Sequence, residues 1–370
     1  MMMKKIVWVS PDSFLDTDKF ILPKLLIYYN IHWIVLLEKK SRFHEEDFET
    51  LRHEHKNLNV EFVYQRRLRN PLNIFTFIKL SNIIRRDGCD VTYLNIGPTP
   101  WCLAMIPFIK SDKTIVTAHQ GRVHEGMSYK KLTTFVRKIW YKHFLNVNMF
   151  SKSQALLFKK DFPSSNIYQL TLGLKEFGTP TNQRPKIGDV IFLSFGTLNY
   201  AKNIDLLIDA ACLLYERGVK NFKVSINGSC KDWSWYQQKI KYPEIFQLDI
   251  RMIDNSEIPN LFNGSHYFVQ PYRVVSQSGP TKIAYNYNLP VIVSNLPGFL
   301  DELEEGVNGY SFEKGNVKSL ADRMQYLIEH HSTDYDSLQE RMRAYTTKHY
   351  AMNVLVDQYC NMLEEVMNQK

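Results

Sequence analysis

Residues 190–203 read VIFLSFGTLNYAKN, and this segment sets the fold that we expect for the second half of the chain. Its first six residues are mostly apolar and end at a glycine, which is typical of a strand buried on both faces of a parallel sheet. Gly196 ends the strand, and Lys202 stands at the start of the next helix. A glycine allows close backbone approach, and a helix N-terminus with a lysine favours phosphate. Taken alone, however, the segment is better explained as an ordinary structural turn.

The same alternation of short apolar strands and longer helical stretches runs through both halves of the chain. In the first half we expect strands at residues 6–9, 33–37, 60–64, 91–94 and 114–117. In the second half we expect strands at 223–226, 267–269 and 291–293, and amphipathic helices at 204–215 and 317–328. This pattern predicts two doubly wound α/β units. Ligands of such sheets bind beyond the carboxyl ends of the strands, and two facing units form a cleft at their interface.

Residues 176–187 interrupt the alternation, because they contain Gly178, Pro180 and Pro185 and few apolar side chains. Such a composition is typical of a linker. Two domains are also the natural expectation for 370 residues. The expected organisation is an N-terminal domain at 1–175, a linker at 176–187, a C-terminal domain at 188–348 and a closing helix within 349–370.

The composition is that of a folded protein with anionic partners. Apolar residues make up 44% of the chain and charged residues 23%, which excludes a disordered chain. The net charge of +8 favours phosphorylated substrates, acidic lipids or nucleic acid. No nucleic-acid motif accompanies the charge, so we expect no nucleic-acid partner. The five cysteines form no C-x-x-C pair, and neither a secretion signal nor a spanning segment is recognisable, so we expect a cytoplasmic protein.

A second polar segment, PYRVVSQSGPTKIA at residues 271–284, follows the strand expected at 267–269. Its Ser-Gln-Ser-Gly run presents hydroxyl groups and backbone N–H groups just before a helix, which is an arrangement suited to an anion. An ordinary serine and glycine helix cap is the alternative explanation.

The order and spacing of these segments resemble the retaining, nucleotide-sugar-dependent glycosyltransferases of group 1, which have the GT-B fold. The resemblance is close over residues 190–328 and more diffuse before them. It implies an α/β fold of two facing Rossmann-like domains with a cleft between them, and a last helix that crosses back to the first domain. The matching positions are Gly196, Lys202, Asn227, Gly228, Pro271, Tyr272, the PVIVS run at 290–294, Gly298, Glu302, Gly306, Asn308 and Gly309.

The resemblance assigns the donor to the C-terminal domain, with no metal or other cofactor. Two glutamates usual in the family are replaced by Val275 and Ile283, and a usual arginine is replaced by Thr197. The chain resembles a divergent Ser-Gln-Ser-Gly subgroup instead, in which Arg273 or Lys282 could neutralise the diphosphate. The loss of both glutamates also leaves open a non-catalytic homologue that binds a nucleotide sugar or a glycan. The candidate donor-binding residues are Gly196, Lys202, Gly228, Arg273, Gln277, Ser278, Gly279 and Lys282.

In the first half, His119 follows the strand expected at 114–117 and opens a glycine-containing loop. A hydrogen-bonded loop histidine is the simpler explanation, although histidine can also exchange protons or hold a sugar hydroxyl. The resemblance favours a catalytic-site role in which His119 orients the donor or the acceptor. Asp12, Asp16 and His124 are candidate acceptor-side residues, while Asp16 is better explained as a charge favoured at a helix start near Lys19.

Residues 129–144, YKKLTTFVRKIWYKHF, combine cations with aromatic side chains. Such a helix could lie on an anionic membrane, or it could pack on the core with a solvated basic face. We therefore expect a glycosyltransferase that moves a sugar with retention to a glycan or lipid-linked acceptor in cell-surface polysaccharide or glycoconjugate synthesis. Peripheral contact with the inner face of the cytoplasmic membrane would fit this activity.

Overall fold

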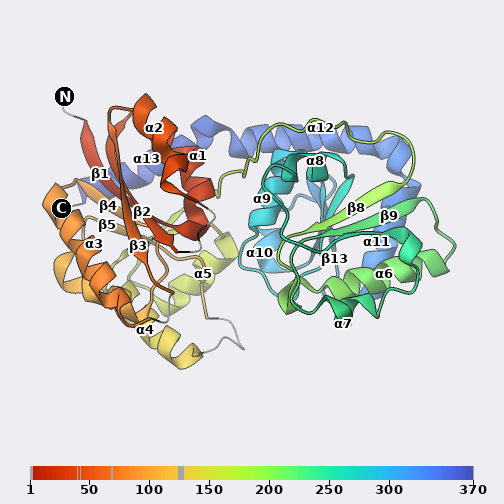
Figure 1. Ribbon diagram of the computed structural model, residues 1–370, viewed down its shortest axis with the longest axis horizontal. Helices are drawn as coiled ribbons and strands as arrows, with labels where there is room; N and C mark the ends of the chain where they lie inside the picture. Colours follow the sequence, from red (N-terminus) through yellow and green to blue (C-terminus); the bar gives the residue numbers. More distant parts are fainter. Residues whose placement is uncertain (1–2, 40, 42, 68–69, 124–128, 370) are drawn as a thin grey trace. The chain divides into compact units, whose positions relative to one another are not determined.

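The computed structural model describes residues 3–39, 41, 43–67, 70–123 and 129–369. The chain forms two compact units, each with its own parallel sheet (Figure 1). The first unit comprises Met1–Gly173 and Met352–Lys370, and the second comprises Leu174–Ala351. Each unit is described by itself below.

The described part of the first unit contains a seven-stranded sheet in the order β3-β2-β1-β4-β5-β6-β7. Successive residues of the central strands alternate between two cores, as expected for strands covered on both faces. Trp8 and Trp33 pair in register and face one core with α1 and α13, while Val7 and Ile34 face the other with α3 and α4. The strands are β1 (Lys4–Pro11), β2 (Tyr29–Glu38), β3 (Leu58–Gln65), β4 (Val91–Leu94), β5 (Thr114–Thr117), β6 (Asn146–Met149) and β7 (Asn166–Gln169).

The helices of this unit continue the predicted alternation, and the last of them comes from the far end of the chain. Leu355 and Leu363 of this closing helix are buried in the same core as Trp8. The helical segments are η1 (Asp12–Phe14), α1 (Leu15–Leu25), η2 (Glu45–Phe48), α2 (Glu49–Glu54), α3 (Asn73–Asp87), η3 (Pro100–Phe108), α4 (Lys130–His143), α5 (Lys152–Asp161) and α13 (Met352–Asn368).

The second unit contains a six-stranded sheet in the order β10-β9-β8-β11-β12-β13. The first strand, β8, lies between β9 and β11, so the strand order reverses there. A crevice for ligands is expected at the carboxyl ends of the strands at such a reversal. The strands are β8 (Val190–Phe195), β9 (Phe222–Asn227), β10 (Phe246–Asp249), β11 (Tyr267–Gln270), β12 (Val291–Ser294) and β13 (Gly309–Phe312).

Helices cover both faces of this second sheet. One core is formed with α6 and α11, and the other with α8, α9 and α12. The helical segments are η4 (Tyr200–Lys202), α6 (Ile204–Glu216), α7 (Trp233–Gln237), η5 (Pro243–Ile245), α8 (Ile258–Asn263), α9 (Gly279–Asn286), α10 (Pro297–Leu300), α11 (Val317–Glu329) and α12 (His331–Tyr350).

Two local features differ from the expectations. The helix expected near Lys19 begins at Leu15, because the turn η1 leads directly into α1 and Leu15 is fully buried. The segment 176–187 lies within the second unit and is attached to it. Its Thr181 backbone N–H donates to Asn260 at 2.7 Å, and its Arg184 donates to the Tyr287 carbonyl at 2.8 Å.

Candidate functional site

Two of the predicted donor residues are glycines that touch each other at the ends of neighbouring strands. Gly196 follows β8 with φ 118°, and Gly228 follows β9 with φ 141°. A Cβ atom on Gly228 would lie 1.8 Å from the Gly196 carbonyl oxygen, so only glycine fits there. Beside them the two loops line a cavity of about 870 Å³, whose walls include Tyr200, Trp235 and Tyr236. The cavity therefore lies directly beyond the ends of β8 and β9, between the two loops that follow them.

The predicted phosphate ligand Lys202 ends η4 and reaches across to the loop after β11. Its Nζ donates to the Tyr272 hydroxyl at 2.6 Å and lies 3.8 Å from the centre of that ring. Among the described residues, no carboxylate pairs with this lysine. Lys202 thus brings an uncompensated positive charge to the carboxyl end of β11.

Arg273, the second candidate cation of this loop, is already engaged. Its guanidinium forms an ion pair with Asp205 at 2.8 Å and donates to the Tyr200 carbonyl at 2.5 Å. Its backbone N–H also donates to the Ala201 carbonyl at 2.9 Å. These bonds join the loop after β11 to the loop after β8, so Arg273 holds the two loops together in this structure.

The Ser-Gln-Ser-Gly run forms the N-terminus of α9, as expected. Ser278 is the N-cap and accepts from the Thr281 backbone N–H, while Gln277 precedes it in a half-buried position. Gly279 begins the helix, and a Cβ atom there would lie 3.4 Å from Cε of Lys175. The positive end of the helix dipole therefore lies at the same sheet edge as Lys202.

Sequence reasoning missed Gln270, the last residue of β11, although it links these groups. Its side chain is fully buried and donates to both the Tyr272 and Ser278 hydroxyls. Its position at the end of a strand, directly before Pro271-Tyr272, was the only signal available in the sequence.

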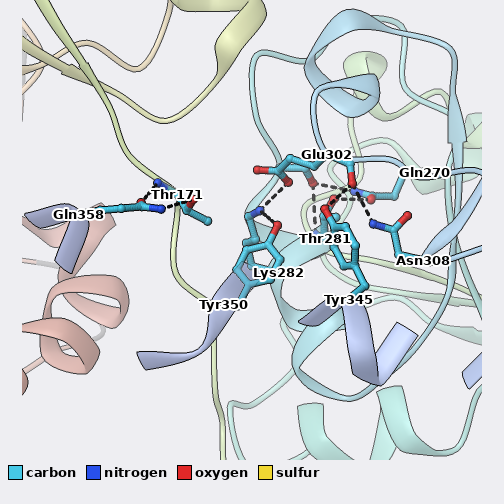
Figure 2. A network of polar contacts seen from close by, with 10 residues as sticks. Thr171, Gln270, Thr281, Lys282, Glu302, Asn308, Tyr345, Tyr350 and Gln358 are labelled. Atoms are coloured by element: carbon cyan, nitrogen blue, oxygen red, sulfur yellow. Dashed lines mark hydrogen bonds and ion pairs between the residues drawn. The ribbon is translucent and has the colours of Figure 1, made fainter. Parts of the chain in front are cut away.

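Lys282 points into the interior of the second unit. Its side chain is 1% exposed, and its Nζ lies 2.5 Å from a Glu302 carboxylate oxygen and 2.8 Å from the Tyr350 hydroxyl (Figure 2). Burial lowers the pKa of Lys282, and the neighbouring Glu302 opposes that shift. The charge of Lys282 is thus neutralised within the protein, whereas that of Lys202 is not.

In the first unit, His119 follows β5 and stacks on Phe14, with ring centres 4.3 Å apart. Burial lowers the pKa of His119 to about 4, so the imidazole is neutral at physiological pH. Its Nδ1 atom is buried and has no hydrogen-bond partner among the described residues. A neutral imidazole can accept a hydrogen bond from a hydroxyl group or donate one to it, which suits a role in orienting a sugar.

The acceptor-side candidates lie partly beside this histidine. Asp12 belongs to η1 and Asp16 to the first turn of α1, on the two sides of Phe14. The Asp16 carboxylate accepts from the Thr17 backbone N–H at 2.9 Å but makes no side-chain cap of the helix. His124 lies outside the described residues.

Asp18, in the first turn of α1, is a second buried polar residue. Its carboxylate accepts from the Ser10 hydroxyl at 2.6 Å and from the Asn95 amide at 3.2 Å. Burial raises the pKa of Asp18 to about 6. These bonds fix the start of α1 to the ends of β1 and β4.

The basic segment 129–144 contains α4, and only one face of this helix is exposed as the membrane hypothesis requires. Arg137, Trp140 and Phe144 are buried, so they cannot contact a membrane. Arg137 instead donates to the carbonyls of Gln120 and Gly121 in the loop after His119, both at 2.9 Å. The exposed residues of the segment are Tyr129, Lys130, Lys131, Leu132, Thr134, Phe135, Lys138 and Lys142.

Neither a metal site nor a membrane span is found in the part of the chain that the structure describes. No three His, Cys, Asp or Glu side chains come together there in a way that could hold a metal ion. No helix within those residues is long and apolar enough to cross a membrane. The expectation of a metal-independent reaction stays a prediction.

Comparison with solved structures identifies the class of fold. A glycosyltransferase from Rickettsia africae ESF-5 has a TM-score of 0.74 at 16% identity and covers 100% of both chains. A sucrose-phosphate synthase from Thermosynechococcus elongatus has a TM-score of 0.74 at 11% identity, covering 98% of this chain and 99% of its own. HepE of Anabaena, in complex with UDP and glucose, has a TM-score of 0.72 at 14% identity, covering 98% and 100%. The predicted GT-B class of α/β fold is therefore confirmed.

The comparison with protein families gives a match in the second unit. Residues 180–349 match the family model described as Glycosyl transferases group 1. No curated protein sequence matches the chain. This match lies within the second unit, and the resemblance drawn from the sequence motifs is confirmed.

Proposed function

We propose that this protein transfers a sugar, with retention of configuration, from a nucleotide-sugar donor to a glycan or lipid-linked acceptor. The observation that carries the proposal is the edge of the second sheet, where Lys202 and the N-terminus of α9 meet the glycine-lined ends of β8 and β9. A cation and a helix dipole beside strand ends without side chains suit a diphosphate. The structural neighbours agree with this class of ligand, because HepE holds UDP and glucose.

The acceptor is proposed to meet the first unit. His119, neutral and with an unpartnered Nδ1, would orient a sugar hydroxyl rather than act as a nucleophile. Asp12 of η1, Asp16 of the first turn of α1, and His124 complete the acceptor side of the proposal. A relative in fold supports a glycan acceptor, since TarM of S. aureus was solved with fondaparinux, alpha-GlcNAc-glycerol and UDP.

The chemistry proposed for the chain's own residues is electrostatic. As the bond between the sugar and the diphosphate breaks, negative charge develops on the leaving phosphate oxygen, and Lys202 with the α9 N-terminus would stabilise it. No metal is required in this proposal, because these groups supply the positive charge. Cell-surface polysaccharide or glycoconjugate synthesis on the inner face of the cytoplasmic membrane is the proposed setting, with the exposed face of α4 as the contact.

A second candidate function follows from the two replaced glutamates. Val275 and Ile283 occupy the positions where the family carries these acidic side chains, and neither can bond a sugar or ribose hydroxyl. A homologue that binds a nucleotide sugar or a glycan without transferring it would tolerate such losses.

One experiment separates the two functions. Purified protein is first screened with UDP-, GDP- and ADP-sugars for thermal stabilisation, since a ligand of the folded state raises the melting temperature. The stabilising donor is then incubated with the protein, and release of the nucleoside diphosphate is measured. Stabilisation with release of the diphosphate supports the transferase, whereas stabilisation without any release supports the binding homologue. A chain that no nucleotide sugar stabilises would contradict both.

A further inference from the structure

The loop that carries His119 is held from two sides by side chains that have no part in the proposed function. Arg137 of α4 donates from Nη2 to the carbonyl oxygens of Gln120 and Gly121, both at 2.9 Å. The Gly121 backbone N–H donates to Oε1 of Gln154, in the first turn of α5, at 2.9 Å. The backbone on the far side of His119 is therefore bonded to side chains of two neighbouring helices.

The same loop also packs directly on the start of α5. A Cβ atom on Gly121 would lie 2.4 Å from the Gln154 carbonyl oxygen and 2.9 Å from Cβ of Leu157, so only glycine fits there. A backbone N–H can only donate, so the Gln154 amide must turn its oxygen toward Gly121. This contact thus fixes the orientation of the amide as well as the position of the loop.

Arg137 is a costly residue on the buried side of a helix. It is 8% exposed, and in the described part of the chain no carboxylate pairs with it. The two carbonyl oxygens and the Tyr141 ring, centred 5.2 Å from the guanidinium carbon, offset part of its charge. An apolar side chain of similar size would fill the same space without burying a charge. Packing alone therefore does not explain an arginine here, whereas the bonds to the two carbonyls do.

The residue placed by these contacts is His119. On its near side, the Ala118 backbone N–H donates to the Asn148 carbonyl of β6 at 2.9 Å. On its far side, α4 and α5 hold the loop. The imidazole stacks on Phe14, and its Nδ1 has no hydrogen-bond partner among the described residues. The position of the ring therefore depends on this stacking and on the backbone held at either side.

We propose that Arg137 and Gln154 are positioning residues, which hold the His119 imidazole where it orients a substrate hydroxyl. Such support matters because a displacement of about 1 Å in a group that orients the substrate can lower the rate about 100-fold. The inference rests on the proposed function for the role of His119. The placement of its ring, in contrast, is measurable without any substrate.

Two pairs of variants and a control test the proposal. Arg137→Met leaves both carbonyl oxygens without their donor, whereas the ammonium group of Arg137→Lys can still donate. Gln154→Leu removes the acceptor of the Gly121 N–H, whereas Gln154→Glu keeps an accepting oxygen. Arg52→Met, at an exposed position on α2 in the same unit, makes the same substitution as the first variant and serves as the matched control.

The placement of the imidazole is measured by NMR on the full chain. The ring signals of His119 are assigned by their absence in His119→Asn, and stacking on Phe14 shifts them from the values of an exposed histidine. We expect these signals to move toward the exposed values in Arg137→Met and Gln154→Leu, and to move less in the two conservative variants. They should stay unchanged in Arg52→Met.

Turnover is measured as release of nucleoside diphosphate from UDP-glucose, GDP-mannose and ADP-glucose, and affinity by calorimetric titration of UDP, GDP and ADP. Arg137→Met and Gln154→Leu should lower kcat at least about tenfold. Arg137→Lys and Gln154→Glu should recover part of that loss. The Kd of the nucleoside diphosphate should stay that of the wild type in every variant, because the proposed donor site lies on the second unit.

Each result decides the inference. Ring signals that are unchanged in Arg137→Met and Gln154→Leu would overturn it, as would displaced signals with full turnover. An equal loss of diphosphate affinity and turnover would overturn it too, because a merely structural role predicts that result. Displaced signals in a protein whose wild type releases no diphosphate would support the positioning by Arg137 and Gln154 and contradict the proposed function. If Arg137→Met does not fold, Arg137→Lys and Gln154→Leu decide by the same criteria.

Discussion

Lys202 and Lys282 carry the same charge in opposite surroundings. Lys202 contacts a neutral tyrosine at the edge of the sheet, whereas Lys282 lies 2.5 Å from Glu302 in the interior. A charge that is already paired inside the protein contributes little to an anion outside it. The two lysines, which looked equivalent as phosphate ligands in the sequence, are therefore expected to act differently.

Replacing Lys202 should weaken the donor complex directly. In Lys202→Ala, one charge-assisted hydrogen bond to the diphosphate is lost, and we expect about 10- to 100-fold weaker nucleoside diphosphate binding. Lys348→Ala, an exposed lysine on α12 in the same unit, serves as the matched control and should bind as the wild type does. Equal affinity of all three proteins in calorimetric titrations would show that Lys202 does not contact the diphosphate.

Asp18 should make stability depend on pH in a recognisable direction. Its pKa in the folded protein is about 6, above the value of about 4 for a free aspartate, so the folded state favours the protonated form. Its contribution to stability is complete below pH 4 and is lost as the pH rises through 6. The wild type should thus lose up to about 3 kcal/mol between these limits relative to Asp18→Asn.

The measurement compares the free energies of unfolding of both proteins in denaturant at pH 4.5, 6 and 7.5. Any constant offset introduced by the amide cancels, because only the change with pH is compared. Parallel pH profiles for the two proteins would show that Asp18 titrates normally.

At the scale of helices and strands, the apolar pattern predicted most of the fold. The strands at 91–94 and 114–117 were located to the residue, because four consecutive buried side chains mark a strand covered on both faces. Strands β6, β7, β10 and β13 were missed, because polar or glycine residues interrupt each of them and leave no apolar run. Helix α12 was missed for a similar reason, since few of its twenty residues are buried.

The residues of the candidate site also fall into two groups, those that the sequence indicated and those that it did not. Gly196, Lys202 and Ser278 follow strands directly, so local sequence order indicated where they would lie. Gln270 and Asp18 act through partners that are brought to them by folding, 8 and 77 residues away in the chain, and no local pattern could indicate those contacts. The burial of Lys282 could not be foreseen for the same reason, because its partner Glu302 comes from the segment after α10.

The network around Lys282 joins three elements, α9, the segment after α10 and the end of α12. In Glu302→Gln, the ammonium group stays buried without a counter-charge, so we expect a loss of about 3 kcal/mol in stability. In Lys282→Met the remaining carboxylate is 25% exposed and keeps some contact with water, so the loss should be smaller. The double variant should recover most of the loss seen in Glu302→Gln.

Denaturant unfolding of the two single variants and the double variant measures this coupling as a double-mutant cycle. Additive losses in the cycle would show that the pair contributes nothing to stability. Donor affinity should survive in Lys282→Met, which distinguishes this structural lysine from Lys202.

At the scale of the whole molecule, the net charge of +8 indicates a partner only once the positions of the cations on the surface are known. Part of it lies on α4, where the buried face packs through Trp140 and Tyr141 and the exposed face carries four lysines. Phe135, 60% exposed, stands among those lysines. An exposed aromatic ring among cations suits the headgroup region of an anionic bilayer.

Vesicle binding tests this face of α4 directly. A lysine near an anionic surface contributes about 1 kcal/mol, so replacing Lys130, Lys131 and Lys138 by Gln should weaken binding to vesicles rich in phosphatidylglycerol about 100-fold. Phosphatidylcholine vesicles, or high salt, should abolish binding of the wild type in the same sedimentation assay.

The control replaces three exposed lysines of the second unit, Lys220, Lys318 and Lys348, and makes the same change in net charge. If both triple variants lose affinity equally, the attraction belongs to the overall charge and α4 is not a membrane contact; if only the α4 variant loses it, the contact lies on that helix.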